Sequence, residues 1–267
     1  MDIREMIMSE NMYSDFTLQE LMAVAAAAEI KDGEKVIIGT GLPLLGGLLA
    51  QRTHAPSMIA IYESGAIDCK PLVTPFSVAD PVLVPGAAMQ GGLIDGLGMV
   101  HAGDIDVGFL GGAQIDKYGN LNTHVIGDYY SPTVRLAGSG GSNDIGAGCK
   151  RTVIMMLHQK QRFPEKVDFV TTPGYFDGAG QREMMGFLGD GPSVVVSTMG
   201  ILRFHSKTKE MYLESYHPGV TIEQIKSNTG WDLKVAEDVK ETARPTPEVI
   251  RILREELDPT GIFLKKN

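Results

Sequence analysis

The order of apolar and polar positions along the chain predicts alternating helices and buried strands. A capping box at 17–20 opens a predicted helix, because the apolar residues after it recur at the spacing of one helix face. A continuous apolar run at 35–38 predicts a buried strand, followed by a glycine-rich loop at 39–43 and a helix over 44–52. A second apolar run at 58–62 predicts the next strand. This order is typical of parallel strands joined by crossover helices.

The rest of the chain continues the same alternation. A second capping box opens at Thr221, and a final amphipathic helix has Pro247 in its first turn and ends at Asp258. We therefore expect an α/β fold with an open, mainly parallel sheet flanked by helices. The further strands are predicted at 107–110, 153–156, 169–170 and 194–197, with a hairpin from 200–204 and 211–216.

Two segments do not fit this alternation. Residues 1–16 are expected to form an irregular N-terminal arm, which leaves 17–267 as a single domain. The stretch 71–103 is long, rich in Gly and Pro and weakly periodic, which predicts a connection without regular structure. Because such long connections are uncommon unless functional, this one is a candidate cover for a site or a subunit interface.

Charge and composition exclude several classes of function. The net charge is −9 and lysine and arginine form no run, which argues against nucleic-acid binding. No segment reaches about 18 uninterrupted apolar residues, and the N-terminus lacks the apolar core of a signal peptide, so neither a membrane span nor secretion is predicted. We expect a protein of the reducing cytoplasm. Its two cysteines, Cys69 and Cys149, form no paired motif and its histidines no i, i+4 pair, which argues against a metal site.

Glu63 is the first candidate for chemistry. It follows the strand predicted at 58–62 and precedes Ser64 and Gly65. The carboxyl ends of parallel strands are where open α/β sheets place their ligands. A carboxylate there can act on a ligand, cap the following helix or face solvent, and the short motif alone does not choose between these roles.

Glycine-rich turns supply further candidates. Gly39 and Gly41 stand at the end of the first predicted strand, where they permit close approach of a ligand or simply a tight turn; the third glycine of a dinucleotide fingerprint is missing. The run from Gly138 to Gly141 can turn several N–H groups toward one anion or can form a flexible surface loop. The amide of Asn122 can orient a ligand carbonyl or bond the backbone of its own turn.

Short motifs in a fixed order link these candidates to a known family. Each motif is weak alone, but in this order and spacing they resemble family I CoA-transferases, and among these the catalytic-glutamate B subunits of the glutaconate type. The resemblance covers nearly the whole chain after the N-terminal arm. The motifs are G-T-G-L-P at 39–43, E-S-G at 63–65, G-G-A-Q-I-D at 111–116, Y-G-N-x-N at 118–122, I-G-D-Y at 126–129, G-S-G-G at 138–141, T-x-P-G at 171–174 and R-E-E-L-D-P at 254–259.

The resemblance implies an open α/β fold, with 17–267 as a single CoA-transferase domain, and an assembly of A and B subunits, a heterotetramer or larger. It also implies that Glu63 is the catalytic glutamate and that the 138–141 segment stabilises an oxyanion. The expected oxyanion- or CoA-binding residues are Gly39, Gly41, Asn122, Gly138, Gly140 and Gly141.

The expected reaction is transfer of CoA between an acyl-CoA and a carboxylic acid, with a dicarboxylate such as glutaconate as the expected acid. A carboxylate that attacks a thioester yields a mixed anhydride and CoA thiolate, and return of the thiolate yields a glutamyl-CoA thioester on Glu63. This chemistry needs a dry cleft and oxyanion donors but no metal and no permanently bound cofactor, because the CoA thioester is itself the substrate. An acyl-CoA hydrolase or decarboxylase on the same scaffold, and a non-catalytic CoA-binding subunit, are the alternatives.

Overall fold

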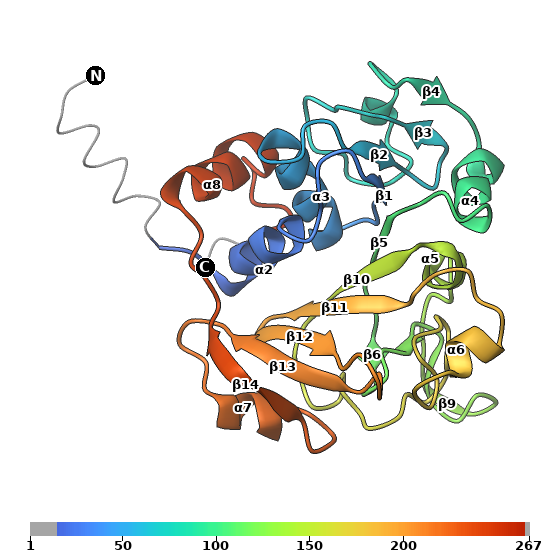
Figure 1. Ribbon diagram of the computed structural model, residues 1–267. Helices are drawn as coiled ribbons and strands as arrows, with labels where there is room; N and C mark the ends of the chain where they lie inside the picture. Colours follow the sequence, from blue (N-terminus) through green and yellow to red (C-terminus); the bar gives the residue numbers. More distant parts are fainter. Residues whose placement is uncertain (1–14, 265–267) are drawn as a thin grey trace.

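The computed structural model describes residues 15–264 and is built around one sheet of ten strands (Figure 1). The predicted arm at 1–16 falls almost entirely outside the described residues. Two small antiparallel pairs lie outside the large sheet: β6 (Gln114–Ile115) with β7 (Leu121–Asn122), and β8 (Val125–Gly127) with β9 (Pro132–Arg135). From one edge of the large sheet to the other, the strands are β14 (Lys234–Glu241), β13 (Met211–Tyr216), β12 (Gly200–Phe204), β11 (Pro192–Ser197), β10 (Arg151–Met156), β5 (Val107–Leu110), β1 (Lys35–Ile37), β2 (Ile59–Ile61), β3 (Ala66–Ile67) and β4 (Met89–Gln90).

The five central strands are parallel, and the direction in which strands are added changes among them. β1 pairs with β2 and β5, and β10 pairs with β5 and β11, all in parallel. The chain leaves β1 through α3 (Leu42–Arg52) for β2 on one side, but it passes from β5 through α5 (Ser142–Gly148) to β10 on the other. Open α/β sheets bind ligands where connections diverge in this way, at the carboxyl ends of the strands. The predicted α/β fold is confirmed, and its ligand-binding edge is expected near β1, β2 and β5.

Helices cover both faces of the sheet. One face packs against α2 (Leu18–Ala27), α3, α8 (Pro247–Arg251) and the π-helical η2 (Ile252–Leu257), and the other against α4 (Leu93–His101), α5 and α7 (Ile222–Ser227). Successive residues of a strand point to opposite faces of the sheet and so belong to two separate hydrophobic cores. In β1, Val36 packs in the core under α2 and α3, and Ile37 packs in the core under α4 and α5. Both side chains are fully buried, and burial of one such side chain contributes about 1.5–3 kcal/mol.

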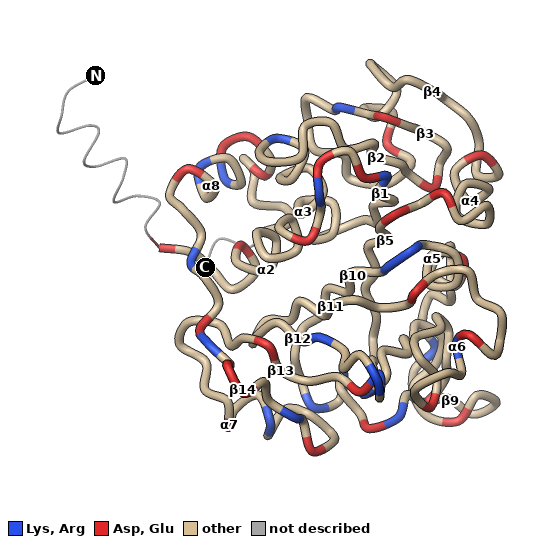
Figure 2. The backbone as a smooth tube through the Cα atoms, in the orientation of Figure 1, with Lys and Arg blue, Asp and Glu red and all other residues tan. Residues whose placement is uncertain are grey.

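Charges of both signs are interspersed on the same elements (Figure 2). Two ion pairs join the segment directly after α2 to strands that are distant in sequence. Arg203 of β12 pairs with Glu29 at 2.6 Å, and Arg151 of β10 pairs with Glu34 at 2.9 Å. These half-buried pairs link the helical layer to the sheet across large separations in sequence.

Most of the predicted elements are confirmed. β5, β12 and β13 have the predicted bounds, and Thr17 and Thr221 each begin a helix with a complete capping box. The strand predicted at 169–170 is wrong, because this segment is irregular and Phe169 stacks on His124 and Tyr129 instead of pairing in a sheet. The edge strand β14 was not predicted, since its charged sequence KVAEDVKE contains no apolar run.

The stretch 71–103 is more regular than predicted. It contains η1 (Pro81–Leu83), β4 and the nine-residue helix α4. Asp95 closes the start of α4 by accepting the Gly92 N–H at 2.7 Å. The position of Gly96 inside α4 requires glycine, because a Cβ there would lie 2.9 Å from the Tyr62 carbonyl oxygen. The glycines of this stretch therefore permit close packing against the end of β2 and do not mark a structureless connection.

A buried polar network lies beyond the carboxyl ends of β10, β11 and β13. His158 bonds through Nδ1 to the Ser197 hydroxyl and through Nε2 to the Thr229 hydroxyl, both at 3.0 Å. His217 contacts the Thr242 hydroxyl at 3.0 Å and the Ser197 carbonyl oxygen at 2.8 Å. Burial lowers the pKa of His158 to about 3 and that of His217 to about 4, so both rings are neutral at neutral pH.

Candidate active site

Glu63 projects from the carboxyl end of β2, beside the point where the strand order changes direction. The turn after it is closed by the Gly65 N–H, which donates to the Tyr62 carbonyl oxygen at 2.9 Å. Gly65 has a φ of +93°, and a Cβ there would come within 2.5 Å of the backbone of Gly91 and Gly92. The E-S-G motif is therefore a tight turn, packed under the segment before α4, that presents Glu63 at the edge of the sheet.

The Glu63 carboxylate is half-buried and accepts no hydrogen bond from residues 15–264. Burial raises the pKa of Glu63 above its usual value, and the nearby Asp144 carboxylate raises it further. Asp144 lies in the first turn of α5 and pairs with His101 of α4, with 3.2 Å between Oδ1 and Nε2. A carboxylate in this setting keeps its lone pairs available for attack on an electrophile.

The segment 138–141, here called the glycine loop, brings its last residue against Glu63. A Cβ built on Gly141 would lie 2.9 Å from Oε1 of Glu63 and 3.0 Å from its carboxyl carbon, so this approach requires glycine. Gly138 and Gly140 have φ values of +96° and +51°, which turn the loop back on itself. The backbone N–H groups of Gly140 and Gly141 donate to no acceptor within the described part of the chain. They are therefore available to an anion beside Glu63.

Gly39 and Gly41 lie at the end of β1, the strand next to β2. Ile37 of β1 pairs with Ile61 of β2, so the 39–41 turn and Glu63 occupy the same edge of the sheet. Gly41 has a φ of +89° and precedes the first turn of α3. Among residues 15–264, the N–H groups of Gly39 and Gly41 also find no acceptor. The turn is a second group of unpaired donors at this edge.

Asn122 is fully engaged within the chain. Its amide nitrogen donates to the Gln114 side chain at 2.7 Å and to the Val125 carbonyl oxygen at 2.6 Å, and its amide oxygen accepts the His124 N–H at 2.9 Å. The side chain is completely buried. The Asn122 side chain therefore bonds to the backbone of its own turn and to Gln114, and its amide is not free to orient a ligand.

Sequence reasoning gives no role to Gly96 and Asp144, which lie near Glu63, or to His101, which pairs with Asp144. Asp144 directly follows the glycine run, and carboxylates are favoured in the first turn of a helix, but this signal is readable only once α5 is known. Gly96 and His101 carry no local signal, because their role depends on how α4 packs against the end of β2. Cys149, which forms no paired motif in the sequence, is fully buried, and burial raises the pKa of its thiol to about 12.

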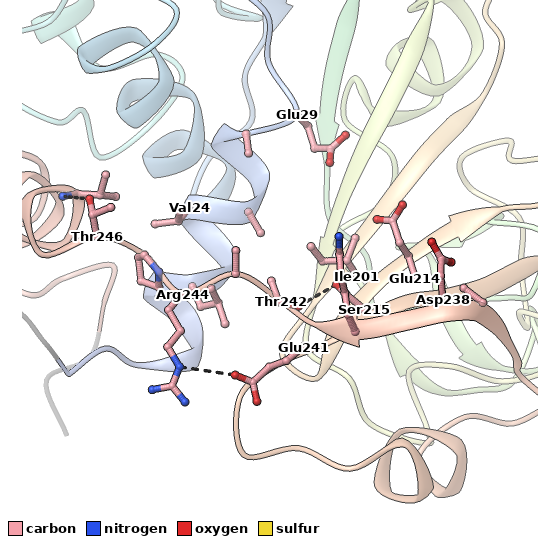
Figure 3. Close-up of a pocket in the computed structure, with 18 of the residues that line it drawn as sticks. Val24, Glu29, Ile201, Glu214, Ser215, Asp238, Glu241, Thr242, Arg244 and Thr246 are labelled. Atoms are coloured by element: carbon pink, nitrogen blue, oxygen red, sulfur yellow. Dashed lines mark hydrogen bonds and ion pairs between the residues drawn. The ribbon is translucent and has the colours of Figure 1, made fainter.

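A groove of about 670 Å³ lies away from Glu63, between α2 and strands β12–β14 (Figure 3). Val24 and Ile201 contribute apolar surface, and Glu29 and Glu214 contribute carboxylates. Both carboxylates pair with Arg203, at 2.6 and 3.1 Å, and so are not left as free acids. None of the residues lining this groove belongs to the site around Glu63, and we assign the groove no part in the chemistry.

Two other kinds of feature are absent from the described residues. No cluster of His, Cys, Asp or Glu in residues 15–264 has the arrangement of a metal site. Within the same range no helix is long and apolar enough to cross a membrane.

Known proteins are similar to this chain in sequence and in fold. The family model described as Coenzyme A transferase matches residues 19–228. The B subunit of glutaconate CoA-transferase from Acidaminococcus fermentans is 45% identical over 261 residues, which cover 95% of this chain and 97% of that protein. The B subunit of 3-oxoadipate CoA-transferase from Pseudomonas knackmussii is 41% identical over 243 residues, which cover 90% of this chain and 93% of that protein.

The similarity extends to a solved structure. Glutaconate coenzyme A-transferase from Acidaminococcus fermentans matches with a TM-score of 0.90 at 43% identity, over 96% of this chain and 100% of that chain. The resemblance inferred from the ordered motifs is confirmed, and so is the enzyme class. Proteins of this class use CoA thioesters as substrates. The chain belongs to the coenzyme A transferase family.

Proposed function

We propose that this chain transfers CoA between an acyl-CoA and a carboxylic acid through a covalent thioester on Glu63. The observation that carries the proposal is the setting of the Glu63 carboxylate, which is half-buried, without donors from residues 15–264, and directly against Gly141. A carboxylate that only capped a helix would accept backbone N–H groups, and Glu63 accepts none from the described residues.

The chemistry divides into two half-reactions. A Glu63 oxygen attacks the thioester carbonyl carbon, and collapse of the tetrahedral intermediate expels CoA thiolate and leaves a mixed anhydride. The thiolate then attacks the Glu63 carbonyl carbon, which releases the donor acid as a carboxylate and leaves a glutamyl-CoA thioester. The acceptor carboxylate attacks this thioester, and the same steps in reverse form the new acyl-CoA and regenerate the Glu63 carboxylate. No proton or electron is gained or lost overall.

Each attack places negative charge on a former carbonyl oxygen, and the site must stabilise it. The N–H groups of Gly140 and Gly141 are the proposed donors, with those of Gly39 and Gly41 as the second group. Loss of one oxyanion donor costs about 10²–10³ in turnover in well-studied enzymes, so these unpaired donors account for a large part of the expected rate enhancement.

The chain is proposed to act with a companion A subunit, in a heterotetramer or larger assembly. The relatives above are named as B subunits, which implies a partner in their enzymes. Large apolar side chains are exposed on the helix that packs against the Glu63 turn: Ile94 and Leu93 on α4 are 87% and 58% exposed. A partner that covered such side chains would also keep water from the anhydride. Full activity of the isolated chain, compared with the co-produced pair, would contradict this part of the proposal.

The proposed acid substrate is a dicarboxylate such as glutaconate. The two relatives are named for glutaconate and 3-oxoadipate, which are both dicarboxylates. Transfer rates with mono- and dicarboxylic acceptors of equal chain length test this assignment. A higher kcat/KM for the monocarboxylates would contradict it.

Covalent trapping tests the central proposal. The chain and its companion are incubated with acyl-CoA alone and treated with borohydride, which reduces a glutamyl thioester to an alcohol. Peptide mass spectrometry is expected to find this change on Glu63, and Glu63→Gln should show none. Glu237→Gln, which removes an exposed carboxylate on β14, is the matched control and should be labelled like the wild type. An adduct on another residue, or none, would overturn the proposal.

The same preparation separates the alternatives. A hydrolase or decarboxylase would consume acyl-CoA without an acceptor acid, whereas a transferase turns over only when an acceptor is present. A non-catalytic CoA-binding subunit would form no adduct on this chain.

A further inference from the structure

The T-x-P-G segment at 171–174 has no role in the chemistry described so far. It lies in the irregular connection between β10 and β11 and is largely buried. Its two threonines reach the two ends of the glycine loop, which is distant from them in sequence.

Thr171 supports the start of the glycine loop through Thr123. The Thr171 hydroxyl oxygen accepts the Thr123 N–H at 2.9 Å. Thr123 donates its own hydroxyl to the Gly138 carbonyl oxygen at 2.7 Å, and its carbonyl oxygen accepts the Gly138 N–H at 2.9 Å. The first residue of the loop is thus held by two hydrogen bonds to Thr123, which is itself tied to Thr171.

Thr172 supports the other end of the glycine loop. Its hydroxyl donates to the hydroxyl of Ser142, the first residue of α5, at 2.9 Å. Its methyl group packs against Gly146, where a Cβ would clash with it. Its backbone bonds to Leu121 in both directions, at 3.1 and 3.0 Å, and only 1% of the residue is exposed. Thr172 therefore holds the start of α5 from a fixed position.

Arg182 fixes the far end of α5. It is carried by the short helix α6 (Gln181–Met184), labelled in Figure 1, and it is only 2% exposed. Its guanidinium donates to Gly146 at 2.6 Å and Ala147 at 3.2 Å in the last turn of α5, and to Pro173 at 3.2 Å and Gly174 at 3.1 Å in the T-x-P-G segment. A further bond of 2.6 Å reaches the Gly189 carbonyl oxygen. Since a buried charge is costly unless its donors are satisfied, these bonds join α5 and the segment 171–174 into one unit.

We infer that Thr171, Thr172 and Arg182 are positioning residues that hold the glycine loop at a set distance from the Glu63 carboxylate. The inference rests on the function proposed above. Thr171 holds the loop through Thr123, and Thr172 and Arg182 hold α5, the helix that follows the loop. They act on the reaction through Gly140 and Gly141. Donors that are already held in place need no reorganisation as charge develops on the oxyanion, which is why their support matters for rate.

Thr172→Val gives the sharpest test, because it keeps the branched shape and the methyl group and removes only the hydroxyl. We expect kcat to fall about tenfold, with KM for acyl-CoA near the wild-type value, since misplaced groups at a reacting centre cost rate more than binding. The rate of borohydride trapping on Glu63 should fall by the same factor. Thr172→Ser keeps the hydroxyl bond to Ser142 and should restore kcat.

Ser193→Ala is the matched control. It removes a hydroxyl bond of 3.1 Å to the Thr152 carbonyl oxygen at the opposite, amino ends of β10 and β11. Its kcat per folded molecule should equal that of the wild type. Arg182→Lys keeps the charge but reaches fewer carbonyls, and it should lower kcat more than it raises KM; if this variant does not fold, the Thr172 variants decide the question.

Two results would overturn the inference. One is a Thr172→Val protein that loses thermal stability but keeps wild-type kcat and the wild-type trapping rate on Glu63, as expected of a purely structural residue. The other is an equal loss of kcat in Thr172→Ser and Thr172→Val, which would exclude the hydroxyl bond as the cause. Failure of the proposed function looks different, because the wild type itself would then carry no adduct on Glu63.

Discussion

Gly141→Ala should separate catalytic geometry from stability. The backbone of Gly141, at φ −84° and ψ 3°, is accessible to alanine, so the substitution introduces no backbone strain. The new Cβ would lie 2.9 Å from Oε1 of Glu63, whereas ordinary contacts begin at 3.4 Å, and the carboxylate must therefore move by about 0.5 Å (3.4 minus 2.9). Because the carboxylate ends a flexible side chain, this movement costs little folding free energy.

The expected result is a catalytic defect in a folded protein. A misplacement of about 1 Å costs about 10²-fold in rate, so a shift of half that size should lower kcat about tenfold, or about 1.4 kcal/mol of activation free energy. Stability should be unchanged or about 0.4–1 kcal/mol higher, because alanine lowers the entropy of the unfolded chain. Steady-state kinetics of the two-subunit enzyme, the trapping rate on Glu63 and calorimetric unfolding measure the three quantities.

Gly219→Ala, in the turn after β13 and outside the site, is the matched control, and it should behave in the opposite way. Its φ is +80°, but no atom lies within 4 Å of the position of a new Cβ. Left-handed backbone costs a non-glycine residue about 1–2 kcal/mol, so stability should fall while kcat per folded molecule changes less than about twofold. The reasoning fails if Gly141→Ala retains wild-type kcat, or if both variants lose activity to the same extent.

Three further predictions address charge and chain length at the site and in the buried network. Glu63→Asp should abolish transfer, because withdrawing the carboxylate by about 1.5 Å spoils the attack geometry; acyl-CoA hydrolysis by the same variant is the accompanying assay, and retained transfer would count against a nucleophilic role. Asp144→Asn removes a neighbouring negative charge that raises the pKa of Glu63, so the acidic limb of the kcat/KM profile should move to lower pH; an unchanged limb would show that burial alone sets it. The lowered pKa values of His158 and His217 mean that the unfolded chain binds more protons below about pH 6.5, so these groups stabilise the fold at neutral pH and that contribution falls as the pH drops toward 4. Denaturant unfolding of His217→Gln should show a shallower dependence on pH over this interval than the wild type, and an equal slope would contradict the assignment.

The sheet was largely predictable because its central strands are continuous apolar runs. In β5 and β11 the pattern is dense enough to locate the strand, since parallel strands are buried on both faces. Glu63 was predictable for a related reason: its position after such a run places it at the edge of the sheet where ligands bind.

The helices α4 and α5 next to the site were not predictable, because their glycine residues have low helix propensity and make the segments read as loops. In α4 and α5 glycine provides space for another segment: Gly96 faces the Tyr62 carbonyl oxygen and Gly146 faces the Thr172 methyl group. Composition alone makes both segments resemble loops. The contact of Gly141 with Glu63 also depends on where α5 packs, so sequence reasoning treats Gly140 and Gly141 alike, although only Gly141 touches the carboxylate in the structure.

The bonds from Arg182 of α6 to α5, the helix that follows the glycine loop, also bear on how activity is lost on heating. α6 has only four residues, and the methionines at its end are largely exposed, Met184 by 84% and Met185 by 60%. Segments with little buried apolar surface open locally at a lower free energy than the core. Opening of α6 alone would withdraw Arg182 from α5 while the ten-stranded sheet stayed folded. Amide hydrogen exchange should therefore be faster in 181–189 than in β10 and β5, and thermal inactivation should precede the loss of secondary structure.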